Sequence, residues 1–80
     1  MTLVNDDVFK IVAQVAKKIP EDLTLETRLA EDLMLKSISK IELAALLENK
    51  FNISISNFEI RLPKNIEEII ELIQNKIKQV

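Results

Sequence analysis

Ser37 is the residue of this sequence best suited to covalent chemistry, because its hydroxyl precedes an apolar segment with helical spacing. A serine at the start of a helix is exposed, but it needs a base to become a nucleophile. The chain has no His and no Cys, so the usual general base and the triads that depend on it are absent. It has no Gly, and therefore no Gly-rich phosphate-binding loop. This inventory argues against an enzyme and leaves binding, scaffolding or covalent carriage.

The composition predicts one small domain, residues 1–80, with an aliphatic core. Hydrophobic residues make up 48% of the chain, but only three are aromatic, all of them Phe. The formal net charge is −2, and the charges are interspersed without a basic block suited to nucleic acid. No apolar run is long enough to span a membrane, and the N-terminus lacks a signal-peptide pattern. We therefore expect a cytoplasmic monomer that binds no nucleic acid.

The first half of the chain predicts one helix followed by a long ordered connection. Apolar residues at helical spacing predict a helix from about Asp6 to Lys18, with Asn5 or Asp6 as its cap. Residues 21–36 predict a loop that contains five leucines, which should pack back on the core. We expect a short helical turn after Thr27. Ordered connections of this length are uncommon and often functional.

The second half predicts three more helices. One should run from Ser37, as its N-cap, to about Asn49. Residues 56–59 have the form of a capping box, which predicts a short helix ending near Arg61. Asn65 predicts the cap of a last helix that reaches about Lys78. The fold class is therefore all-α, with three main helices and one short helix.

Residues 32–43 form the most informative segment, with the sequence Asp-Leu-Met-Leu-Lys-Ser-Ile-Ser-Lys-Ile-Glu-Leu. The segment resembles the phosphopantetheine attachment segment of acyl carrier proteins, whose usual pattern is Asp-Leu-Gly-x-Asp-Ser-Leu-x-x-Val-Glu-Leu. Ile38 and Ile41 match this pattern conservatively, and five positions match it identically: Asp32, Leu33, Ser37, Glu42 and Leu43. The resemblance extends over nearly the whole chain.

This resemblance implies an acyl-carrier-like four-helix bundle with a long first loop. It also implies that Ser37 bears a 4′-phosphopantetheine arm derived from coenzyme A. The protein would then be a non-catalytic carrier of fatty acyl or polyketide groups, with aminoacyl groups as the alternative cargo. The implied partners are a phosphopantetheinyl transferase, which would supply the base that this chain lacks, and acyl-loading and acyl-processing enzymes.

Two departures from the family pattern concern the start of the second main helix. Met34 replaces a Gly and is expected to alter the loop, since Gly permits backbone angles that Met does not. Lys36 replaces an Asp that many carriers present to the transferase, so the choice of transferase stays open. Lys36, Lys40 and Glu42 are candidate contacts for partner enzymes, and a solvated helix face is the alternative. Because typical carriers are strongly acidic here, the two lysines favour a specialised pathway.

Apolar residues near this segment have two interpretations. They could line a pocket for the acyl chain, or they could simply be core, which is the simpler hypothesis. The residues are Ile38, Ile41, Leu46, Phe51, Phe58 and Ile66. The acidic pairs at 31–32 and 67–68 match no calcium loop, so we assign no metal.

The principal alternative to a carrier is a helical interaction module that has kept the fold but not the arm. In that case Ser37 would be only an N-cap, and Met34 and Lys36 are the residues that favour this hypothesis. The sequence does not identify the cargo or the pathway. It favours a free-standing protein over a domain cut from a larger synthase.

Overall fold

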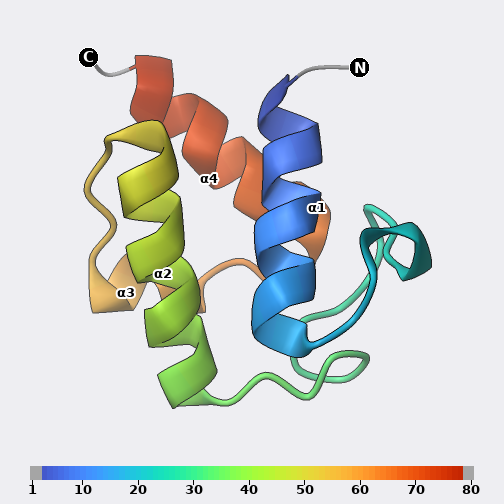
Figure 1. Ribbon diagram of the computed structural model, residues 1–80. Helices are drawn as coiled ribbons and strands as arrows, with labels where there is room; N and C mark the ends of the chain where they lie inside the picture. Colours follow the sequence, from blue (N-terminus) through green and yellow to red (C-terminus); the bar gives the residue numbers. More distant parts are fainter. Residues whose placement is uncertain (1–2, 79–80) are drawn as a thin grey trace.

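The computed structural model describes residues 3–78, and its regular elements in that range are all helical (Figure 1). Within residues 3–78 the only β-type pairing is an isolated bridge between Arg28 and Asn65. The predicted fold class is therefore confirmed, with three long helices and one short one. The elements in chain order are α1 (Leu3–Ala16), the 3₁₀ helix η1 (Pro20–Asp22), α2 (Ser37–Phe51), α3 (Asn57–Arg61) and α4 (Ile66–Lys78).

The helices form a bundle in which α1 packs against both α2 and α4, while α3 packs against α2. The start of α1 and the end of α4 lie at one end of the bundle, and the start of α2 lies at the other (Figure 1). The long connection from α1 to α2 first rises beside α1, where η1 lies, and then returns to this second end (Figure 1). Ser37, as the first residue of α2, therefore lies at the end of the bundle opposite to the start of α1.

The core is aliphatic, as the composition predicts. No polar or charged side chain is buried within the described part of the chain. Five isoleucines at helical spacing predict an apolar face for the last helix, and Ile66, Ile69, Ile70 and Ile73 of α4 are buried as expected, whereas Ile77 is exposed. The largest side chains that are almost fully buried come from every α-helix and from the first connection: Val8, Val12, Leu29, Leu43, Leu47, Ile60, Ile66, Ile69 and Ile73.

The first helix differs from its predicted bounds at both ends. It begins at Leu3, so Asn5 and Asp6 lie inside its first turn, and the prediction that one of them caps it is wrong. Their place in this turn still suits the positive end of the helix dipole. The helix ends at Ala16 because Lys17 adopts a left-handed conformation, with φ of 59°. The Lys18 N–H then donates to the Ala13 carbonyl at 2.9 Å, which closes the helix end.

The long connection packs on the core as predicted. Leu23, Leu29 and Leu35 are buried, and the other two leucines of this segment are half-buried. Its only regular helix is η1, which begins at Pro20, where the ring fixes φ for a first helical residue. After Thr27 the chain forms only a hydrogen-bonded turn, so the short helix lies earlier than expected.

Capping interactions define the two C-terminal helices. The predicted capping box is confirmed, because Ser56 Oγ accepts from the Glu59 N–H at 3.1 Å and Glu59 Oε1 accepts from the Ser56 N–H at 2.9 Å. Asn65 Oδ1 accepts from the Glu68 N–H at 2.9 Å, as expected for the cap of α4. An ion pair of 2.6 Å between Glu59 Oε2 and Lys76 Nζ then joins α3 to α4.

Two isoleucines one turn apart on α4 provide a matched test of the core. Ile73 has no exposed surface, whereas Ile77 is 40% exposed. We expect Ile73→Ala to lower the free energy of unfolding by about 2–5 kcal/mol, since a buried cavity adds to the lost transfer energy. Ile77→Ala should cost less than about 1 kcal/mol. Urea denaturation followed by circular dichroism measures both, and equal losses would contradict this description of the core.

Candidate functional site

Backbone hydrogen bonds join the first connection to the start of α4. The N–H groups of Ile66 and Glu67 donate to the carbonyls of Thr27 and Leu25, at 3.2 and 3.0 Å. In return, the Leu29 N–H donates to the Lys64 carbonyl at 3.0 Å. The first N–H groups of a helix have no partner inside it, so the connection satisfies donors that α4 cannot satisfy itself. We call this set of three hydrogen bonds the loop–α4 contact.

Asp32, the first residue of the motif, organises the turn that follows this contact. Its carboxylate accepts a hydrogen bond of 2.8 Å from the Arg28 backbone N–H and forms a 3.2 Å ion pair with the Arg28 guanidinium. The Asp32 N–H donates to the Arg28 carbonyl at 3.1 Å. Acceptance from the backbone N–H, followed by the guanidinium hydrogen bond, lowers the pKa of Asp32 below its ordinary value. Arg28 was not among the predicted site residues, although its i,i+4 spacing from Asp32 is visible in the sequence.

The segment between this turn and α2 is anchored by Leu35. Leu35 is buried, and its N–H donates to the Leu29 carbonyl at 2.9 Å. Just before it, Met34 adopts the left-handed region with φ of 55°, while its side chain is 77% exposed. A residue with a Cβ pays a conformational cost there that Gly does not. The family pattern has Gly at this position, and the left-handed backbone conformation explains that preference.

Ser37 is the first residue of α2 and is exposed, and the N-cap is Lys36. The prediction that Ser37 itself caps the helix is therefore wrong by one residue. The reason is that Lys36, which follows the anchored Leu35, is extended, with φ of −94° and ψ of 174°, and its carbonyl accepts the first helical bond from the Lys40 N–H. Within residues 3–78, the Ser37 hydroxyl has no hydrogen-bond partner. Its side chain is thus available rather than used for capping.

The start of α2 favours negative charge. No side chain caps the helix, so the N–H groups of its first turn point to solvent with the positive end of the dipole. Lys36 and Lys40 flank Ser37, and neither forms an ion pair within the described range. A phosphodiester on the Ser37 oxygen would lie beside these groups. The residues present therefore fit a phosphate-linked arm.

The six candidate pocket residues do not share one environment. Ile38, Ile41 and Phe58 are exposed, so the hypothesis that they are core is wrong, whereas Ile66 is buried. Ile38 and Ile41 are exposed because the core side of α2 is formed by residues such as Leu43. Leu46 and Phe51 are half-buried. None of the six lines any of four cavities formed by the described residues, so an acyl pocket stays a prediction.

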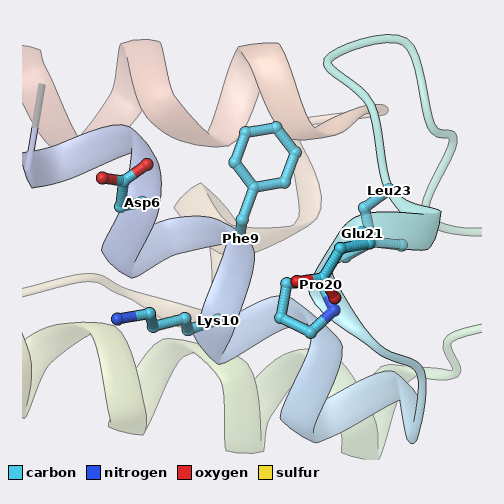
Figure 2. Close-up of a pocket in the computed structure, with 6 residues that line it drawn as sticks. All are labelled: Asp6, Phe9, Lys10, Pro20, Glu21 and Leu23. Atoms are coloured by element: carbon cyan, nitrogen blue, oxygen red, sulfur yellow. The ribbon is translucent and has the colours of Figure 1, made fainter. Parts of the chain in front are cut away.

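Two of these cavities differ in their relation to α2. A groove of about 380 Å³ lies between α1 and η1, and its lining, which includes Phe9, Lys10 and Pro20, takes no residue from α2 (Figure 2). A smaller cavity of about 90 Å³ borders the first turn of α2 and is lined by Leu29, Ala30, Glu31, Lys40, Arg61, Pro63 and Lys64. Arg61 and Lys64 were not predicted as site residues, because they are more than twenty positions from Lys40 and only the fold brings them together.

Other kinds of site find no support in the described range. Within residues 3–78, no group of three acidic side chains is arranged to hold a metal ion. Nor is any helix of that range long and apolar enough to cross a membrane.

Comparison with known proteins agrees with this site. A family model described as a phosphopantetheine attachment site matches residues 6–73. The acyl carrier protein of Thermosynechococcus vestitus is 32% identical over 72 residues, which cover 90% of this chain and 89% of that protein. That of Phytoplasma australiense is 37% identical over 57 residues, 71% of this chain and 75% of the relative. That of Wolinella succinogenes is 30% identical over 69 residues, which cover 86% of this chain and 91% of that protein.

The fold and the matched segment define a phosphopantetheine-dependent carrier. The chain belongs to the acyl carrier protein family, and its cofactor is 4′-phosphopantetheine.

The left-handed conformation of Met34 generates a stability prediction. Met34→Gly should raise the free energy of unfolding by about 0.5–1 kcal/mol, because the relieved backbone strain exceeds the extra entropy that Gly gives the unfolded chain. Little packing is lost, since the side chain is exposed. Met34→Ala is the matched control and should give no gain, because it keeps the Cβ. Thermal and urea denaturation measure all three proteins, and a destabilised Met34→Gly would contradict the assignment.

The Arg28–Asp32 interaction predicts a pH dependence. The pKa of Asp32 is lowered in the folded state, so its contribution to stability is present above its ordinary pKa of 3.8 and is lost as the pH falls through the folded value. Asp32→Asn should be less stable than the parent at pH 7, and the difference should shrink as the pH falls below 3.8. Urea denaturation across pH 7 to 2.5 measures this. Glu26→Gln, at an exposed acid outside the ion pairs of the described residues, should follow the parent.

Proposed function

We propose that Ser37 is the residue to which 4′-phosphopantetheine is attached, and that the chain carries acyl groups on this arm. The observation that supports the proposal most directly is the position of Ser37. It is the exposed first residue of α2, and its hydroxyl is not engaged in capping. It also lies in the position of the serine in the family pattern, five residues after Asp32.

The residues of the chain would bind and orient the arm rather than perform chemistry on it. The Ser37 oxygen would form the ester bond to the pantetheine-bearing phosphate of coenzyme A, while the pyrophosphate bond breaks and 3′,5′-ADP leaves. The serine proton would pass to a base of the transferase, since this chain has no His. The uncapped first turn of α2 and the lysines beside it would stabilise the negative charge of the phosphodiester. When bound, the arm supplies a terminal thiol that holds an acyl group as a thioester.

This assignment makes the chain a non-catalytic carrier with two kinds of partner. One is the phosphopantetheinyl transferase, and the others are enzymes that load and process fatty acyl or polyketide groups. We propose that residues 1–80 act as a single carrier domain, a monomer in the cytoplasm. Lys36 and Lys40 distinguish the start of α2 from the acidic surface typical of the family, which supports a role in a specialised pathway. Glu42, exposed on the same helix, is a further candidate partner contact.

The test is attachment at Ser37. The purified chain is incubated with coenzyme A and a broad-specificity phosphopantetheinyl transferase, and the intact mass is measured. We expect the parent to gain the mass of one phosphopantetheine group and Ser37→Ala to gain none. Ser39→Ala is the matched control, since it removes a hydroxyl two residues further along α2 and should leave modification intact.

The opposite result has a definite meaning. If a folded parent gains no mass with several transferases, Ser37 is not an attachment site for them. The chain would then be a helical interaction module that has kept the fold without the arm. Circular dichroism of each variant shows that a negative result does not come from unfolding.

A further inference from the structure

Large apolar side chains gather on the surface around Ser37. Met34 precedes it and is 77% exposed, and Ile38 follows it and is 76% exposed. Ile41, one turn further along α2, is 48% exposed. These three residues give the start of α2 an exposed apolar surface, and such a concentration is typical of an interaction surface.

Cations surround the start of α2. Lys36 is the N-cap of α2, and Lys40 lies in its first turn. Arg61 is the last residue of α3, and Lys64 lies in the segment after it. The fold joins the two groups, because Lys40, Arg61 and Lys64 line the same small cavity. Within residues 3–78, none of these four cations forms an ion pair. Their charges are therefore available to a partner.

Few carboxylates oppose these cations. Glu31 lines the same cavity, and Glu42 is exposed on α2. Asp32 is already paired with Arg28, and Glu59 with Lys76. Glu68 is a third carboxylate beside this group, because its Oε1 accepts from the Lys64 N–H at 2.7 Å. Four cations outside ion pairs therefore face three such carboxylates here, although the whole chain has a net charge of −2. The protein is acidic overall but presents a positive surface where Ser37 is exposed.

We propose that this surface docks protein partners whose own docking face is apolar and ringed by carboxylates. The inference rests on the proposed function, because an enzyme that acts on Ser37 or on its arm must cover the start of α2. Burial of Ile38 and Ile41 requires an apolar counterpart. Burial of unpaired cations is costly, so carboxylates must face Lys36, Lys40, Arg61 and Lys64. A partner with a basic docking face would be repelled.

The test uses one acyl-processing enzyme in two forms. The first is a ketoacyl synthase whose docking face is ringed by Lys and Arg, and the second is the same enzyme with those residues changed to Glu. The substrate is this chain, modified at Ser37 and charged with a hexanoyl group. We expect kcat/KM for acyl transfer to be about tenfold or more higher with the acidic form at low salt. The preference should shrink as salt rises.

Variants of the carrier assign the preference to this surface. Lys36→Glu with Lys40→Glu should reverse the preference for the acidic synthase. Arg61→Glu with Lys64→Glu should weaken this preference while leaving the residues of α2 unchanged. Lys10→Glu with Lys78→Glu is the matched control, because it changes the net charge equally on α1 and at the end of α4 and should leave the preference unchanged. Circular dichroism confirms that each variant is folded.

Three results would overturn the inference. Equal kcat/KM with both forms of the synthase, or preference for the basic form, would show that the cations do not select the partner. An equal reversal in the control variant would show that only net charge matters. Binding of the parent to phosphatidylglycerol vesicles or duplex DNA, without any preference between the synthases, would assign the cations to another polyanion. Failure to modify Ser37 is a separate outcome, which overturns the proposed function before either synthase is used.

Discussion

The loop–α4 contact is the interaction on which the candidate site depends. The fourteen residues between Asp22 and Ser37 form no regular helix but must still deliver the serine to a defined place. Three backbone hydrogen bonds to the start of α4 hold the first part of this segment. Leu29 and Leu35, both buried, then fix the second part against the core. The start of α2 is thus positioned by the start of α4, a helix that lies thirty residues further along the chain.

Much of this architecture could be predicted from local patterns. The isoleucine stripe of α4, the capping box of α3 and the leucines of the first connection act through spacing that is visible in the sequence. The segment 32–43 was recognisable because its residue types match a family pattern. Helix ends were less predictable. Ser37 looks like a cap, but the anchoring of Leu35 on the core makes Lys36 the residue that leaves the helical conformation.

Long-range features were not predictable from the sequence. The cavity that brings Arg61 and Lys64 beside Lys40 depends on how α3 packs against α2, which no local spacing reports. The exposure of Ile38, Ile41 and Phe58 also needed the fold, since hydrophobicity alone suggested that they were core. Asp32 is a further example. It matches the family pattern, but its role in holding the turn through Arg28 is evident only from the geometry.

A chain without glycine must make its tight backbone turns with other residues. Within residues 3–78, Lys17, Met34 and Asn52 occupy the left-handed region, which is less favourable for Lys and Met than for Gly and is more readily adopted by Asn. The same absence has an opposite effect on the unfolded chain. Gly has the largest number of accessible backbone conformations, so an unfolded chain that lacks it has less entropy to lose on folding. The conformational cost of the left-handed turns is therefore offset by the smaller entropy that the unfolded chain loses on folding, which matters for a domain with so small a core.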